Sequence, residues 1–155
     1  MTQPGQQLHQ ISFPGMCPVE DALAQLAQAG IEERGAIFTR REVVEFILNL
    51  VGYSPDQPLH EKRLLEPSFG DGDFLLIVIE RLLKAWQEHN GKSDPIKAMA
   101  DAIRGVELHH GLFEATRNKV IGLLKAEGII AKAATALADT WLATGDFLLT
   151  PLPFT

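Results

Sequence analysis

A short apolar run, a glycine turn and a long apolar helix follow one another directly in the middle of the chain. Residues 63–66 end at Pro67, and this short apolar stretch predicts a buried strand. Residues 73–89 carry apolar side chains at helical spacing, which predicts a helix. Between them, Gly70 and Gly72 lack Cβ atoms, so a ligand can closely approach the backbone amides. This strand–turn–helix unit constrains the fold more than any other feature.

Strands and helices alternate through the rest of the sequence. Further strands are predicted at residues 103–108 and 145–149, and further helices after Ser93 or Asp94, at residues 112–126 and at residues 131–142. Alternation of this kind implies parallel strands joined by helical crossovers. Right-handed crossovers then give the sheet order 3-2-1, with helices on both faces. The expected fold class is α/β, a partial Rossmann-like sheet of three parallel strands.

The N-terminal part of the chain is expected to be helical. We predict two units, an N-terminal helical segment at residues 1–60 and the first half of an α/β domain at residues 61–155. A first helix is expected at residues 18–33. Thr39 and Glu42 have the spacing of a capping box for a second helix. The apolar stripe expected on this second helix consists of Val43, Phe46, Ile47 and Leu50.

Composition and charge narrow the class of protein. The 155 residues are 46% hydrophobic and 22% charged, which is typical of a globular protein. The net charge of −6 makes this chain a poor candidate for the main surface that grips a phosphate backbone. A single cysteine, Cys17, excludes an intramolecular disulfide, and no apolar run approaches the roughly 20 residues that span a bilayer. These features lead us to expect a cytoplasmic protein.

Three acidic residues come at the ends of the three predicted strands. Glu66, Glu107 and Asp146 should therefore point into one crevice at the carboxyl edge of the sheet. One acid in such a place is more often a helix cap or a solvated charge. Three acidic residues at the ends of three consecutive strands favour a nucleotide-like ligand, and Gly70 and Gly72 follow the first of them. The reason is that carboxylates accept hydrogen bonds from ribose hydroxyls and from amines.

Other ligand sites fit this turn less well. A dinucleotide fingerprint needs a third glycine where the chain has Leu75, and a phosphate loop needs a lysine that the turn lacks. Asp71 and Asp73 would repel a pyrophosphate but suit a ligand with a sulfonium and an ammonium group. They do not make a calcium loop, because its other oxygen ligands are missing. His109 and His110 are more typical of a helix start than of a metal site, so we expect no metal.

Four blocks in this order resemble one family. They are residues 35–40 (Gly-Ala-Ile-Phe-Thr-Arg), 65–75 (Leu-Glu-Pro-Ser-Phe-Gly-Asp-Gly-Asp-Phe-Leu), 105–108 (Gly-Val-Glu-Leu) and 145–148 (Gly-Asp-Phe-Leu). Together they are similar to the cofactor motifs in the N-terminal half of adenine-specific (N6) DNA methyltransferases of the restriction–modification type. The chain departs from that pattern at Arg40, where the family has proline, and at Ser68-Phe69, where Ala-Cys is commoner.

The resemblance implies S-adenosylmethionine as cofactor. In the family, the threonine block contacts the methionine part, the acid after the second strand binds the ribose hydroxyls, and the Asp-Phe pair holds the adenine. Carried over to this chain, the expected cofactor-binding residues are Phe38, Thr39, Glu66, Pro67, Ser68, Phe69, Gly70, Gly72, Phe74, Glu107, Leu108, Asp146 and Phe147.

The catalytic tetrapeptide of the resembled family, Asn/Asp-Pro-Pro-Tyr/Phe, does not occur in this sequence. We therefore expect no catalytic residue here, a catalytic motif beyond Thr155, and a fragment that is inactive alone. Its expected source is a bacterial restriction–modification or phage-defence system. DNA is the expected partner of the longer enzyme, with self-association through an exposed sheet edge. The alternatives are the cofactor half of an RNA, protein or small-molecule methyltransferase, and a non-catalytic protein-binding scaffold.

Overall fold

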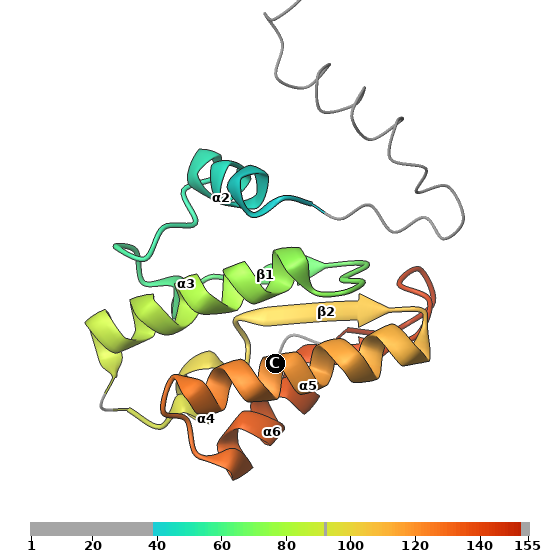
Figure 1. Ribbon diagram of the computed structural model, residues 1–155. Helices are drawn as coiled ribbons and strands as arrows, with labels where there is room; N and C mark the ends of the chain where they lie inside the picture. Colours follow the sequence, from blue (N-terminus) through green and yellow to red (C-terminus); the bar gives the residue numbers. More distant parts are fainter. Residues whose placement is uncertain (1–38, 92, 153–155) are drawn as a thin grey trace, which may run out of the picture. The chain divides into compact units, whose positions relative to one another are not determined.

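The sheet has three parallel strands, β1 (Leu64–Glu66), β2 (Ile103–Glu107) and β3 (Leu142–Thr144), in the order β1-β2-β3 (Figure 1). The computed structural model describes residues 39–91 and 93–152. The described residues belong to one compact unit. The parallel pairing and the strand order confirm the predicted α/β fold. The helix expected at residues 18–33 lies outside the described residues, and the division at residue 60 stays a prediction.

The α-helices begin and end close to the predicted positions, whereas a 3-10 helix occurs in a stretch for which no helix was predicted. The helices are α2 (Arg41–Leu50), the 3-10 helix η1 (Leu59–Glu61), α3 (Asp73–Asn90), α4 (Pro95–Met99), α5 (His110–Ala126) and α6 (Ala131–Trp141). Asp94 caps α4, since its Oδ1 accepts from the amides of Ile96 (2.9 Å) and Lys97 (3.0 Å). Helix α5 contacts α3, β2 and β3. Because α5 lies against α3 and against two of the strands, it borders the end of the sheet where the predicted site residues gather.

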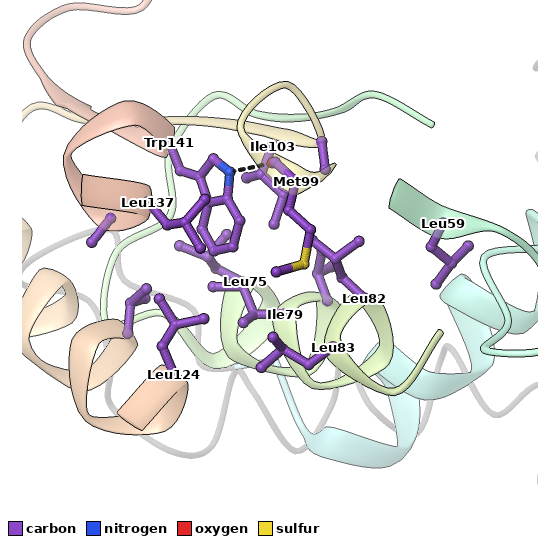
Figure 2. Close-up of a cluster of buried hydrophobic side chains, with 14 of the residues drawn as sticks. Leu59, Leu75, Ile79, Leu82, Leu83, Met99, Ile103, Leu124, Leu137 and Trp141 are labelled. Carbon is purple, nitrogen blue, oxygen red and sulfur yellow. Dashed lines mark hydrogen bonds between the residues drawn. The ribbon is translucent and has the colours of Figure 1, made fainter. Parts of the chain in front are cut away.

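Apolar side chains from α3, α5 and α6 form the core beside β2 (Figure 2). Trp141, which is 1% exposed, packs there and donates its indole N–H to the Met99 carbonyl at 2.8 Å. Trp86 is also buried and donates to Ser93 Oγ. Each large apolar side chain buried in this way stabilises the fold by about 1.5–3 kcal/mol. Both tryptophans are therefore packing residues, as their helical positions predict.

The third strand differs from the prediction. Residues 145–149 do not form it. Instead Leu142, Ala143 and Thr144 pair with residues 105–107 of β2, and a turn follows at residues 147–149. Gly105 leaves room for two neighbouring side chains, because a Cβ there would lie 3.0 Å from Phe69 Cδ1 and 3.1 Å from Leu142 Cδ2. Leu142 continues the apolar pattern of α6, so periodicity alone assigned it to the helix.

Helix α2 also differs from the prediction in its cap and in its buried face. Arg40, not Thr39, is the N-cap, and no side chain caps the helix, so the expected capping box is wrong. Val44 and Leu48 are the buried residues. The expected stripe is instead exposed, with Val43 at 44%, Phe46 at 63%, Ile47 at 39% and Leu50 at 72%. Helix α2 packs on α3, and the face that carries Val44 and Leu48 is the one buried.

Candidate functional site

The turn between β1 and α3 depends on two glycines in left-handed conformations. Gly70 has φ +51° and Gly72 has φ +85°, a region that other residues adopt only with strain. The Gly72 amide donates to the Phe69 carbonyl at 2.8 Å, and the Gly72 carbonyl accepts from the Leu76 amide at 2.8 Å. Gly72 therefore closes the turn and starts α3 at once. A Cβ on Gly70 would meet nothing within 4 Å, so the space beside it is open to a ligand.

Glu107 at the end of β2 connects directly to this turn. Its carboxylate is 3% exposed and accepts the Gly70 amide on Oε2 and the His109 amide on Oε1, each at 2.8 Å. A carboxylate has about four acceptor positions, so the two amides leave capacity for ligand hydroxyls. The structure thus brings together the glycine turn and the second acid, as the sequence predicted.

Glu66 ends β1 and lies half-buried at the same edge of the sheet. Burial raises the pKa of its carboxyl above the usual range, and a backbone hydrogen bond from Ser68 acts in the opposite direction. A carboxyl whose charge is disfavoured in this way would gain from a cationic or hydroxyl-bearing neighbour. Pro67 and Ser68, the next two residues, are exposed.

Asp146 follows the sheet but does not end a strand as predicted. It lies two residues after β3, and its Oδ1 accepts the Leu148 amide at 2.9 Å in the turn that follows. The Gly145 amide donates to the Glu107 carbonyl at 3.0 Å, which holds this segment at the end of β2. Phe147 beside it is half-buried. This hydrogen bond continues the parallel β2–β3 pairing by one residue and brings Asp146 to this edge.

The three remaining predicted apolar positions lie in different environments. Phe69 is 4% exposed and points into the core, where its ring centroid is 6.3 Å from that of Phe113. Phe74 packs partly buried against the core, and Leu108 is 63% exposed just after β2. Phe69 therefore anchors the turn to the core through its buried ring. Phe38 lies outside the described residues.

A cavity of about 370 Å³ lies beside the turn, where α2 meets α3. Its lining residues are Thr39, Arg40, Arg41, Asp73, Leu76, Ile77 and Glu80. Arg41 Nη2 contacts Glu80 Oε2 at 2.6 Å, so one acid of this cavity is paired with a cation from the opposite helix. Thr39 is half-buried and Asp73, at the start of α3, is exposed. The structure thus places the predicted threonine near the helix that follows the glycine turn.

Sequence reasoning missed one residue that touches the turn. Thr116 lies in the middle of α5, is 0% exposed, and donates its hydroxyl to the Gly70 carbonyl at 2.8 Å. Its position on the helix carries no motif, so only the approach of α5 to the turn reveals it. Among residues 39–91 and 93–152, no group of three or more His, Cys, Asp or Glu side chains could hold a metal ion, and no helix is long and apolar enough to cross a membrane.

The sequence is similar to three curated methyltransferases. It is 59% identical over 145 residues to the Type II methyltransferase M.PaeR7I of Pseudomonas aeruginosa, which is 93% of this chain and 25% of the relative. It is 48% identical to the Type II methyltransferase M.XhoI of Xanthomonas vasicola and 32% identical to the Type II methyltransferase M.BstVI of Geobacillus stearothermophilus, each over 125 residues. Those two matches cover 80% of this chain and 23% and 22% of the relatives.

The chain spans about a quarter of the length of these relatives. The matches to M.XhoI and M.BstVI, like the match to M.PaeR7I, extend over most of the 155 residues, so the similarity is not confined to one short motif. Thr155 lies outside the described residues, and the catalytic motif expected beyond it stays a prediction. No family model matches the sequence, and no solved structure matches it.

Proposed function

We propose that this chain, which is similar to Type II methyltransferases over about a quarter of their length, forms the S-adenosylmethionine-binding part of a DNA methyltransferase. The observation that carries the proposal is the contact between Glu107 and Gly70, which places a buried carboxylate against an open glycine turn. Ligands of α/β folds bind at this carboxyl edge of the sheet.

The residues at this edge fit the chemistry of the cofactor. Glu107 keeps acceptor capacity for ribose hydroxyls after binding two amides. Gly70 leaves open space where a side chain would block the approach of a ligand. Asp73 and Glu66 give this edge the negative charge that a sulfonium and an ammonium group would favour.

In the proposed mechanism the residues of this chain bind and orient the methyl donor. In this proposal Glu107 would orient the ribose, Thr39 and Asp73, which line the cavity between α2 and α3, would hold the methionine end, and Asp146 with Phe147 would hold the adenine. When bound, S-adenosylmethionine supplies an activated methyl group on its sulfonium. Correct orientation of a reactive group contributes much of the rate in such direct displacements.

We further propose adenine N6 in DNA as the methyl acceptor of the longer enzyme, in a restriction–modification or phage-defence system. The resemblance of four ordered blocks to the adenine-specific enzymes supports this choice. A base must leave the DNA stack before its amine can meet a methyl donor. The family's catalytic tetrapeptide does not occur in these 155 residues, and in this proposal another part of the longer enzyme supplies it. The 155-residue chain then supplies the donor side and does not methylate DNA by itself.

Titration calorimetry with S-adenosylmethionine tests the proposal. We expect the 155-residue chain to bind, and Glu107→Gln to weaken binding about tenfold or more, because a charged acceptor contributes more than a neutral one. Glu114→Gln, the same substitution at an exposed position on α5, is the matched control and should bind like the wild type. A folded chain that gives no heat with S-adenosylmethionine would contradict the proposal and favour a scaffold role.

A further inference from the structure

Two buried polar side chains converge on a single residue of the glycine turn. Apart from tyrosine and tryptophan, three polar or charged side chains are buried among the described residues: Arg104, Glu107 and Thr116. Glu107 accepts the Gly70 amide at 2.8 Å, and Thr116 donates to the Gly70 carbonyl at 2.8 Å. Both polar groups of Gly70 are therefore held, one from β2 and the other from α5.

Thr116 also contacts the second glycine of the turn. A Cβ on Gly72 would lie 2.6 Å from Thr116 Cγ2, so the threonine methyl occupies the space that any side chain at Gly72 would need. The hydroxyl of Thr116 thus holds Gly70 while its methyl packs against Gly72. Serine would keep the first contact only, and valine would keep the second only.

A second residue of α5 holds the peptide between the two glycines. Lys119 lies three residues after Thr116, on the same face of the helix, and its Nζ donates to the Asp71 carbonyl at 2.8 Å. Residues 70, 71 and 72 are therefore each in contact with α5. These contacts join a flexible, glycine-containing turn to a regular helix.

We propose that Thr116 is a positioning residue for the cofactor, acting through the Gly70 carbonyl, with Lys119 in a supporting role. This inference rests on the proposed function. Fixing the backbone of one residue before binding removes an entropy cost that corresponds to about tenfold in affinity. By holding the turn in its ligand-ready shape, the Thr116 hydroxyl lets the amides near Gly70 meet the ligand without rearrangement.

Two substitutions at Thr116 separate its hydroxyl from its bulk. Thr116→Val removes the hydroxyl and keeps the methyl groups, whereas Thr116→Ser keeps the hydroxyl. Thr140→Val is the matched control, because the exposed Thr140 hydroxyl on α6 also donates to a backbone carbonyl, that of Ala136 at 2.8 Å. We expect S-adenosylmethionine to bind about tenfold more weakly to Thr116→Val, within about threefold to Thr116→Ser, and unchanged to Thr140→Val.

Amide NMR spectra of the ligand-free chain give a readout that does not depend on the cofactor. Thr116→Val should shift the Gly70 and Gly72 amide signals and speed their hydrogen exchange, whereas Thr140→Val should leave both unchanged. A folded Thr116→Val chain with unchanged signals and affinity overturns the inference, as does a Thr116→Ser chain as weak as Thr116→Val. If wild-type chain binds no cofactor, the proposed function fails, and the NMR signals still decide whether Thr116 holds the turn.

Lys119→Met keeps the inference testable if Thr116→Val does not fold, because Lys119 is exposed on α5. This variant should shift the Asp71 and Gly72 amide signals and weaken binding about threefold. Unchanged signals in Lys119→Met, together with unchanged affinity, would overturn the role assigned to α5.

Discussion

The Glu107 carboxylate accepts the amide of Gly70 at 2.8 Å, across 37 residues of sequence. This hydrogen bond joins the end of β2 to the turn that follows β1, so two neighbouring strands are linked at the carboxyl edge of the sheet. Four further properties of the chain can be predicted from contacts around this edge and from the packing of α2.

The two glycines of the turn should differ in their tolerance of alanine. Gly72→Ala places a Cβ 2.6 Å from Thr116 Cγ2 at φ +85°, so we expect a loss of about 2–4 kcal/mol in the free energy of unfolding. Gly70→Ala meets nothing within 4 Å and should cost only about 1 kcal/mol for its positive φ. Urea unfolding of both variants measures the difference, and equal losses would contradict the close contact with Thr116.

The pKa of Glu66 predicts how a neutral substitution changes stability with pH. Burial raises this pKa, so the protonated form is favoured in the folded state, and the stabilisation that it gives is lost as pH rises through the folded-state pKa. Glu66→Gln should therefore raise the Tm at neutral pH by on the order of 1–3 °C. The gain should shrink as the pH falls through the raised pKa of the wild-type carboxyl, because the protonated side chain no longer carries the disfavoured charge. A Tm gain of Glu66→Gln that grows as the pH falls would contradict a raised pKa for Glu66.

Apolar packing, and not the surface ion pair, should hold α2 to α3. Leu48 is 1% exposed, so Leu48→Ala should cost about 2–5 kcal/mol in the free energy of unfolding. Arg41→Met breaks an exposed pair with Glu80, at 2.6 Å, and should cost at most about 1 kcal/mol. Denaturant unfolding of both variants in low and high salt separates apolar packing from the ion pair. The loss of stability in Arg41→Met should shrink at high salt, whereas the loss in Leu48→Ala should not.

The free edge of β1 should lead to self-association. Within the described residues β1 pairs with β2 alone, and Leu65 on this strand is 44% exposed. We predict a concentration-dependent rise in mass by light scattering, reduced by Leu65→Lys because a charge on an edge strand disfavours further pairing. Leu149→Lys, at an exposed position outside the sheet, is the control. A wild-type chain that stays monomeric at high concentration would contradict this prediction.

Local sequence patterns predicted the elements that depend on local interactions. The strand, glycine turn and helix at residues 64–90 follow from an apolar run, two residues without Cβ atoms and helical spacing. Asp94 was an expected cap for α4, and its carboxylate satisfies two amides of the first helical turn. Glu107 was placed correctly at the carboxyl end of a strand, and that strand is buried along its whole length.

Only the tertiary structure decided the features that depend on contacts between distant residues. The third strand begins at Leu142, which pairs with Gly105 of β2, and the apolar pattern of α6 does not reveal this pairing. The exposed face of α2 and the role of Thr116 likewise depend on where α3 and α5 lie. The sequence by itself determined the fold class and the acid–glycine site, since periodicity and backbone chemistry are local. Packing determined which face is buried and which distant side chain holds the turn.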